Sequence, residues 1–394
     1  MNSVLLNSAR AISGWIVDIR RTLHQHPEVK YEEVETSRLV QKTLTELGIS
    51  FRHSVARTGV VATLGTGSGP CVALRADMDA LPIHEEADVE FPSRIPGKMH
   101  ACGHDCHTAM LLGAARLLKE RESELRGTVR LIFQPAEEGG AGGARMIEEG
   151  ALQNPGVDRV FGIHVWPELP TGFIGGRTGT LMAAVGSLRI SVRGKGGHAA
   201  FPHMTHDPVV AMSQIICGLQ TVVAREMSPF DPSVVSITTL CAGNAFNVIP
   251  QDVVATGTIR SLTTEGLLRL RAAIERIAVS IASAHRCTAT VERIDDDPDY
   301  PATVNDANSW AMVQKAAADL VPLSQIVEVP PVLGGEDFAY YAEKVPGCFV
   351  GLGIRNEAIG AVEFVHHPRF KVDEAALPVG AALHTSFALH ALKS

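Results

Sequence analysis

The sequence predicts an α/β fold, with a mixed, largely parallel β-sheet flanked by helices and a smaller ferredoxin-like α/β domain inserted into it. Short apolar runs bounded by glycine are typical of strands buried on both faces, as in parallel sheets. Helical periodicity separates some of these runs, as expected for alternating strands and helices. Between residues 186 and 296 the order becomes strand, helix, two strands, helix and strand, which is the ferredoxin-like order.

The elements of the larger domain follow from these patterns. Segment 4–48 has apolar residues at helical spacing, so we expect helices there. A helix is also expected over 108–118, and the apolar C-terminal segment predicts a packed helix. The runs that predict strands are 60–64, 71–74, 129–133, 160–163 and 348–350.

The smaller domain is expected to be an insertion, so both ends of the chain build the larger one. Residues 1–185 and 297–394 would form the larger domain, and 186–296 the inserted domain, which has the size of an independent unit. The elements expected in the insertion are strand 188–192, helix 208–224, strands 233–240 and 252–260, helix 264–284 and strand 288–292.

Composition excludes several classes of protein. An apolar fraction of 45% in 394 residues suits a compact globular protein, and a net charge of −8 without long runs of one sign gives nucleic-acid binding little support. Polar residues interrupt the N-terminus too early for a secretory signal, and no apolar stretch approaches the roughly 20 residues of a membrane span. The seven cysteines are too sparse for a disulfide framework. We therefore expect a cytoplasmic protein without nucleic-acid or membrane partners.

Segment 99–107 is the densest group of metal-binding residue types, with three histidines, two cysteines and an aspartate. Such mixed donors are typical of transition-metal sites, and Cys102 and His104 are the predicted ligands. Alternatives are a Cys102 nucleophile with His104 as its base, or core residues. A base two positions from its nucleophile rarely has the required geometry. His100 and His107 are each more typical of supporting or structural residues than of ligands.

Further candidate residues follow predicted strands. Glu137 and Glu138 come directly after one strand, and His164 ends another. Ligands in α/β sheets collect at the carboxyl ends of strands, so these side chains are expected to lie together. Adjacent carboxylates point in different directions, so one can hold a metal while the other moves protons. The alternative for the glutamate pair is a solvated turn.

Two other groups have open roles on the residues alone. Asp77 and Asp79 follow a strand, where they could bind metal, orient a ligand histidine through its second N–H, or cap a turn. His366 and His367 lie in a predicted loop near the C-terminus, where either one alone is more typical of a surface histidine than of a ligand.

Together these motifs resemble the M20 family of metallopeptidases and aminoacylases. The resemblance is specifically to its amidohydrolase branch, which includes hippurate hydrolases and indole-acetyl-amino-acid hydrolases. It spans nearly the whole chain, because the motifs occur in order from the first quarter to the end. They are RTLHQHPEVKYEE, RADMDALP, MHACGHDCHTAML, LIFQPAEEGGAGGARMI, GIHVWP, GKGGHAAFPH, NAFNVIP, GTIRS, GGEDFAYY and VHHPRFKVDEAALPVGAALH.

The resemblance implies two divalent metal ions (Mn, Zn, Ni or Co) about 3.5–4 Å apart. Glu137 matches the general base and acid, and Asp79 matches the orienting aspartate. A cysteine replaces the family's bridging aspartate, and Asp77 stands where other members carry a ligand histidine, which leaves its role open. The ligands implied by motif match are Cys102, His104, Glu138, His164 and His366.

The inserted domain resembles the family's lid and dimerisation domain. His198 matches a histidine that reaches the partner subunit's active site and stabilises the oxyanion. Asn247 and Arg260 match groups that hold the substrate carboxylate, a role that suits the bidentate guanidinium of arginine. Read without the family, these three residues are structural candidates. The resemblance implies a homodimer or homotetramer formed through this domain.

The expected reaction is hydrolysis of the amide bond of a small-molecule N-acyl amino acid to a carboxylic acid and a free amino acid. Hippurate-like, N-acetyl and indole-acetyl conjugates are the expected substrates. Alternatives are a dipeptidase or carboxypeptidase on the same scaffold, a thiol hydrolase that uses Cys102, and a non-catalytic metal-binding protein. The presence of Glu137 argues against the last alternative.

Overall fold

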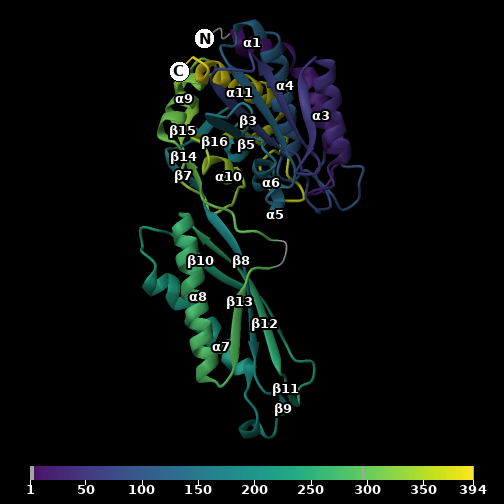
Figure 1. The fold of residues 1–394 in the computed structure, drawn as a ribbon. Coiled ribbons are helices and arrows are strands. Elements are labelled where there is room, and N and C mark those ends of the chain that lie inside the picture. Colours follow the sequence, from purple (N-terminus) through teal and green to yellow (C-terminus); the bar gives the residue numbers. More distant parts are fainter. Residues whose placement is uncertain (1–3, 295–296, 394) are drawn as a thin grey trace. The chain divides into compact units, whose positions relative to one another are not determined.

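The computed structural model describes residues 4–294 and 297–393, which fall into two compact units (Figure 1). Unit 1 comprises the chain up to Leu181, Val304–Pro330 and the chain from Asp337 onward. Unit 2 comprises Met182–Thr303 and Pro331–Glu336. Unit 1 is therefore built from separate stretches of sequence, with unit 2 between them along the chain.

The bounds of unit 2 differ from those of the predicted inserted domain, 186–296, whose last residue lies outside the described residues. The segment Pro331–Glu336 belongs to unit 2, whereas the predicted bounds put it in the larger domain. Backbone pairing explains the difference. The N–H of Ala183 lies 3.1 Å from the carbonyl oxygen of Val332 and 2.9 Å from that of Gly334.

Unit 1 contains, in the described residues, an eight-stranded sheet in the order β1-β2-β4-β3-β5-β16-β6-β15. The central strands β4, β3, β5 and β16 run parallel, whereas β1 and β2 are antiparallel at one edge and β6 is antiparallel to β16. This confirms the predicted mixed, largely parallel sheet. The strands are β1 (Ser50–Val55), β2 (Gly59–Gly65), β3 (Cys71–Asp77), β4 (Thr128–Gln134), β5 (Arg159–Pro170), β6 (Ile174–Gly176), β15 (Ile326–Glu328) and β16 (Gly347–Arg355).

Helices flank this sheet, and α4 packs against α2 and α11 in the hydrophobic core (Figure 1). Gly113 permits this packing, since a Cβ there would lie 2.8 Å from Ile16 Cδ1 and 2.9 Å from Ala381 Cβ. The helices of unit 1 are α1 (Val4–Ala11), α2 (Ser13–Gln25), α3 (Val34–Glu46), α4 (His104–Lys119), α5 (Glu137–Gly140), α6 (Gly142–Glu148), α9 (Ala307–Ala318), α10 (Ala339–Ala342) and α11 (Leu377–Ala391).

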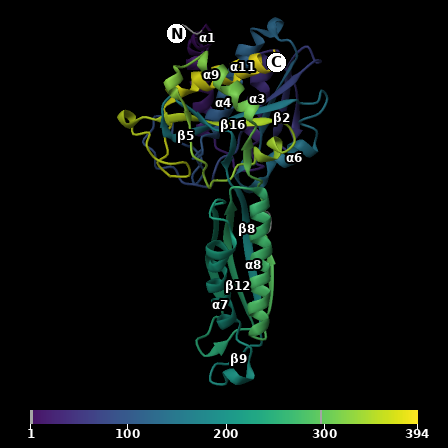
Figure 2. The ribbon, with the colours of Figure 1, turned by 90° about the vertical axis from the view of Figure 1, so that its left-hand side faces the viewer.

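Unit 2 contains an antiparallel sheet in the order β10-β12-β8-β13, with α7 and α8 packed on one face (Figure 2). Alternate residues of β12 are buried, as expected when helices cover one face only. The predicted ferredoxin-like order is confirmed. The elements are β8 (Ala184–Arg193), β9 (Gly197–His198), α7 (Pro208–Thr221), β10 (Ser233–Ala242), β11 (Val248–Ile249), β12 (Asp252–Ser261), α8 (Thr264–Ala284) and β13 (Thr288–Glu292). The short strands β7 (Gly179–Met182) and β14 (Thr303–Asn305) form a separate pair.

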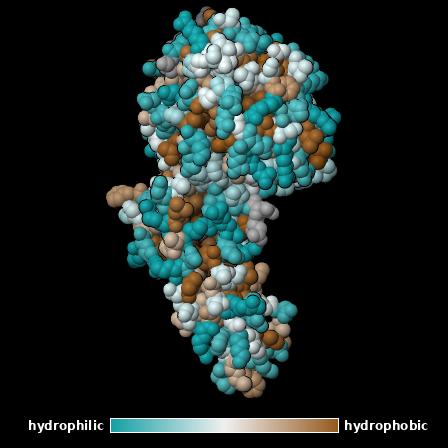
Figure 3. Space-filling model, viewed as in Figure 1, coloured by the Kyte–Doolittle hydropathy of each residue, from teal (hydrophilic) through white to brown (hydrophobic). Residues whose placement is uncertain are grey.

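One finding differs from the expectation of no span-length apolar stretch. Among the described helices, Pro208–Glu226, which is α7 with its π-helical continuation, is long and apolar enough to cross a membrane by length and composition alone. One face of α7 packs into the core of unit 2 through Ala211, Ile215 and Leu219, while Val209 and Val210 are exposed. The surface of unit 2 accordingly shows apolar side chains among polar ones (Figure 3).

Candidate metal centre

The carboxyl ends of three neighbouring strands bring most of the predicted site residues together. Asp77 ends β3 and is paired with Gln134 at the end of β4, directly before the turn that carries Glu137 and Glu138. In β5 the last residue paired with β3 is Gly162, so His164 lies just beyond this pairing. The position of these side chains follows from the parallel pairing of the strands.

Cys102 and His104 are positioned by the start of α4. The helix begins at His104, four residues before the predicted start, because Gly103 turns the chain with a φ of 81°. This left-handed conformation favours glycine. A Cβ at Gly103 would also lie 2.5 Å from Val165 Cγ2. The close approach to β5 places Cys102 beside His164.

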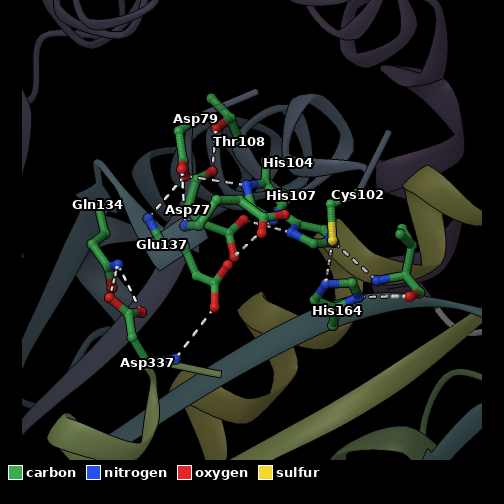
Figure 4. A network of polar contacts seen from close by, with 12 residues as sticks. Asp77, Asp79, Cys102, His104, His107, Thr108, Gln134, Glu137, His164 and Asp337 are labelled. Carbon is green, nitrogen blue, oxygen red and sulfur yellow. Dashed lines mark hydrogen bonds and ion pairs between the residues drawn. The ribbon is translucent and has the colours of Figure 1, made fainter. Parts of the chain in front are cut away.

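Two groups of metal-binding atoms share the Cys102 sulfur. The ligand atoms of Cys102, His104 and His164 lie within 4.8 Å of one another, as do those of Cys102, Glu138 and His366. Cys102 Sγ is 3.4 Å from His164 Nε2, and Glu138 Oε1 is 3.1 Å from His366 Nε2. Figure 4 shows Cys102 and His164 directed toward each other beside His104. The structure therefore brings together all five residues that motif match implies as ligands.

One ring nitrogen of His164 and one of His104 face this centre. His164 Nδ1 lies 2.7 Å from the carbonyl oxygen of Val165 and donates to it, so Nε2 is the nitrogen that faces Cys102. His104 Nδ1 lies 3.3 Å from Asp79 Oδ1, while its buried Nε2 lies 3.8 Å from Asp77 Oδ2 and has no hydrogen-bond partner among the described residues. Second hydrogen bonds of this kind orient histidines that bind metals.

Electrostatics at the centre favour a bound cation. Burial alone would lower the pKa of His104, but the carboxylates of Asp77, Asp79 and Glu138 raise this pKa to about 10. The buried His104 thus carries a proton that a divalent ion can replace. Burial lowers the pKa of His164 well below its usual range, which keeps that imidazole neutral. The Nε2 of His104, which makes no hydrogen bond to the described residues, and the mixed sulfur, nitrogen and oxygen donors fit divalent transition-metal ions.

Glu137 lies beside these donors, and its backbone and side chain are both held in place. Its N–H lies 3.0 Å from Asp79 Oδ1, and the N–H of Glu138 lies 3.0 Å from Asp79 Oδ2. Glu137 Oε1 lies 3.4 Å from the backbone nitrogen of Asp337, toward which its carboxylate points in Figure 4. Asp79 therefore fixes the two glutamates in different directions.

Asp77 takes part in a buried ion-pair network. Its Oδ2 accepts from Arg75 Nη1 at 2.6 Å, and its Oδ1 accepts from His107 Nδ1 at 2.6 Å. His107 Nε2 in turn accepts the N–H of Val165 at 2.9 Å, so both ring nitrogens of His107 are occupied. These contacts favour a supporting role for Asp77 and His107 rather than metal ligation.

Arg75 and Asp337 were not singled out from the sequence. Arg75 Nη2 lies 2.7 Å from Asp337 Oδ1, and Arg75 Nε donates to Gln134 at 2.9 Å. Gln134 Nε2 lies 2.8 Å from both Asp337 oxygens, and Asp337 also accepts the N–H of Gly143 at 2.9 Å. The available signal for Arg75 was a charged residue directly after the apolar run 71–74, in a strand whose residues are all buried.

The remaining histidines differ in their surroundings. His366 has a φ of 66°, and its N–H donates to the Ala101 carbonyl at 2.7 Å, which brings the loop onto the segment that carries Cys102. His366 is exposed, whereas His367 is half-buried and its Nε2 lies 3.8 Å from Glu363 Oε2. His100 is buried, and neither of its ring nitrogens has a hydrogen-bond partner among the described residues.

His198, Asn247 and Arg260 all belong to unit 2. His198 is paired with Val248, directly after Asn247, and both His198 and Asn247 are exposed. Arg260 is half-buried and lies next to the last residue of β12. The strand β11, which pairs with His198, comes shortly before Asp252, the first residue of β12. The eight residue-to-residue steps from Asp252 to Arg260 correspond to about 27 Å of strand. Unit 2 therefore brings His198 and Asn247 together but not Arg260.

Comparison with known proteins gives the class. Residues 73–390 match the peptidase family M20/M25/M40, and the chain belongs to this family. It is 47% identical over 375 residues to IAA-amino acid hydrolase ILR1-like 4 of Arabidopsis thaliana, covering 95% of this chain and 85% of the relative. It is 42% identical over 387 residues to N-acetylcysteine deacetylase of Bacillus subtilis, covering 98% of this chain and 99% of the relative.

Among solved structures, the chain is similar to the YXEP protein of Bacillus subtilis, described as a dinuclear metal binding peptidase from the M20 family. The TM-score is 0.84 at 39% identity, and the match covers 98% of this chain and 99% of the other. The resemblance to the M20 family is confirmed.

Proposed function

We propose that this chain hydrolyses the amide bond of N-acyl amino acids, releasing a carboxylic acid and a free amino acid. The observation that carries the proposal is the group of sulfur, imidazole and carboxylate donors beside the buried Glu137 carboxylate. The relatives named for IAA-amino acid hydrolysis and N-acetylcysteine deacetylation support this substrate class.

Two divalent ions are the proposed cofactors, and Cys102 is the ligand that both share. Cys102 with His104 and His164 would hold one ion, and Cys102 with Glu138 and His366 the other. When bound, such ions acidify water and polarise a carbonyl group. The mixed donor set suits Zn, Mn, Ni or Co better than the all-oxygen sites of Mg or Ca.

Glu137 is the proposed general base and general acid. Its carboxylate accepts a proton from the attacking water and then delivers that proton to the leaving nitrogen, so one group serves both steps. Asp79 supports this role by accepting the backbone N–H of Glu137. The backbone N–H of Asp337 supports it by donating to Glu137 Oε1. No other proton carrier is needed for the amide bond to break.

The experiment that tests the substrate class compares acylated amino acids with dipeptides. Metal-free enzyme is reloaded with Zn, Mn, Ni or Co and assayed with N-acetyl, N-benzoyl and indole-acetyl amino acids beside matched dipeptides. A dipeptide brings an ammonium group that needs a counter-charge beside the site, which an acyl group does not. We expect turnover of the acylated compounds. A preference for dipeptides would establish the peptidase alternative. Inactivation by iodoacetamide with indifference to chelators would establish the thiol hydrolase.

His198, Asn247 and Arg260 are proposed to contact the substrate from two copies of the chain. His198 and Asn247 lie at one end of the unit 2 sheet and Arg260 at the other, about 27 Å away along β12. A small substrate cannot span that distance. A homodimer or homotetramer in which one copy supplies His198 and another supplies Arg260 removes the conflict.

Apolar surface on unit 2 supports this assembly. Strand β10 is at the edge of its sheet and exposes Leu240, and the neighbouring α7 exposes Val209 and Val210. Edge strands and exposed apolar helix faces readily pair with a second copy across a two-fold axis. The same surface accounts for the span-like composition of Pro208–Glu226.

A further inference from the structure

The turn that carries Glu137 and Glu138 has an unfavourable backbone conformation. Ala136 has a φ of 55° and Ala141 a φ of 49°, and both are L-residues in the left-handed region. Such residues cost free energy and persist only where the surrounding structure holds them. The contacts that hold this turn therefore determine where the Glu137 carboxylate points.

Two buried carboxylates capture the N–H groups of three consecutive residues in this turn. Asp79 accepts from Glu137 and Glu138, as described above. Glu33 Oε1 accepts from the N–H of Ala136 at 2.9 Å. Glu33 lies far away in sequence, directly before α3 and at the end of the motif RTLHQHPEVKYEE.

The segment around Glu33 also contacts the far end of the turn. The Tyr31 hydroxyl donates to the carbonyl of Gly140 at 2.6 Å, and the Tyr31 N–H donates to Glu33 Oε1 at 2.9 Å. Thr58 Oγ1 lies 2.6 Å from Glu33 Oε2. Glu33 is fully buried, so these contacts hold its side chain in one orientation.

We propose that Glu33 is a positioning residue for the amide hydrolysis proposed above, acting through the Ala136 N–H to hold the turn that aims Glu137. Asp79 does not do this alone, because it accepts the N–H groups of Glu137 and Glu138, whereas the N–H of the left-handed Ala136 before them donates to Glu33. A small displacement of a catalytic group is costly, since a misplacement of about 1 Å can slow turnover about a hundredfold.

The test compares two side chains of equal length. In Glu33→Gln the amide oxygen can still accept from Ala136 and Tyr31, while the amide nitrogen donates to Thr58 Oγ1. Glu33→Met fills the same space with no acceptor. Thr58→Val is the control, because it removes the Thr58 contact and leaves the Ala136 contact in place.

We expect kcat of Glu33→Met with an N-acyl amino acid to fall about 10- to 100-fold, with KM and metal content near those of the wild type. Glu33→Gln and Thr58→Val should stay within about threefold of the wild-type kcat. Equal kcat in Glu33→Met and Glu33→Gln would overturn the assignment, and so would loss of bound metal in step with kcat. If Glu33→Met does not fold, Glu33→Asp, which shortens the side chain by one methylene, takes its place.

Amide hydrogen exchange separates this inference from the proposed function, because it requires no turnover. In Glu33→Met, a peptide covering 134–141 should exchange faster than in the wild type, while peptides from β5 stay unchanged. In Glu33→Gln the protection should remain. Unchanged protection of 134–141 in Glu33→Met would refute the role of Glu33. A wild-type enzyme inactive on every acylated amino acid would instead refute the proposed function and leave this result interpretable.

Discussion

Cys102 differs from the other four proposed ligands because its sulfur belongs to two donor groups. One group also contains His104 and His164, and the other contains Glu138 and His366. Cys102→Ala should therefore lower the metal content from about two ions per chain to near zero. His366→Ala removes a donor from one group only, so about one ion should remain. Elemental analysis of the purified variants checks this. Equal losses in the two variants would contradict a shared sulfur.

Glu33 also makes stability depend on pH. Burial and the nearby Asp79 charge raise the pKa of Glu33 from 4.5 to about 7, so the folded state favours the protonated form. The free energy of unfolding is then not reduced by Glu33 below about pH 4.5. It decreases as pH rises to about 7, by up to about 3 kcal/mol. Glu33→Gln cannot ionise. Urea unfolding at pH 5 and pH 8 should show that Glu33→Gln becomes more stable relative to the wild type at the higher pH. If the difference in free energy of unfolding were the same at both pH values, it would contradict the raised pKa.

At the scale of residues, the sequence predicted the chemical type of the site better than it predicted which residues contact one another. The donors of the metal centre could be named because cysteine, histidine and carboxylate side chains have few other reasons to cluster. Arg75 and Asp337 could not, because each is recognisable only once distant strands and loops bring the charges together. Glu33 was missed for the same reason, since its partner Ala136 is remote in sequence.

The start of α4 is the element on which the metal centre depends most. Gly103→Ala would force an L-residue to a φ of 81° and bring its Cβ within 2.5 Å of Val165. Cys102 and His104 would both shift, so metal affinity should fall by at least about tenfold. Gly97→Ala is the matched control, with a φ of 78° and no atom near the added Cβ. Metal titration of both variants should show a loss in Gly103→Ala only; equal losses would contradict this placement.

The long, strongly patterned elements were predicted well. Helix 264–284 and strand 288–292 agree with α8 and β13, and the buried strands of unit 1 lie where apolar runs indicated. The start of α4 was wrong by four residues, because glycine before a polar histidine cluster resembles a loop. Short strands such as β6 and β15 were missed, since three residues give no periodic pattern and their pairing is decided by tertiary contacts.

At the scale of the whole molecule, the proposed assembly predicts complementation. His198→Ala and Arg260→Ala should each be nearly inactive alone. Mixed dimers of the two variants would contain one site with both wild-type residues, so random mixing should restore about a quarter of the wild-type activity. Mixing the purified variants under conditions that exchange subunits checks this. No recovery after verified exchange would contradict the supply of His198 and Arg260 by different copies.

The division into two units could be anticipated, but not its finer bounds. A change in strand and helix order is visible in the sequence, whereas Pro331–Glu336 joins unit 2 through backbone hydrogen bonds that leave no sequence pattern. Assembly is likewise a property of surfaces, such as the exposed apolar residues of α7 and β10, that become recognisable only in the folded unit.

Turnover and metal content of Glu137→Gln test the central claim most directly. The amide cannot accept the proton of the attacking water, yet Glu137 belongs to neither donor group that contains Cys102. With an N-acyl amino acid that the wild type hydrolyses, kcat should fall at least about a hundredfold while the metal content stays at the wild-type value. Retention of more than about a tenth of the wild-type kcat, or loss of metal in parallel with activity, would contradict the account.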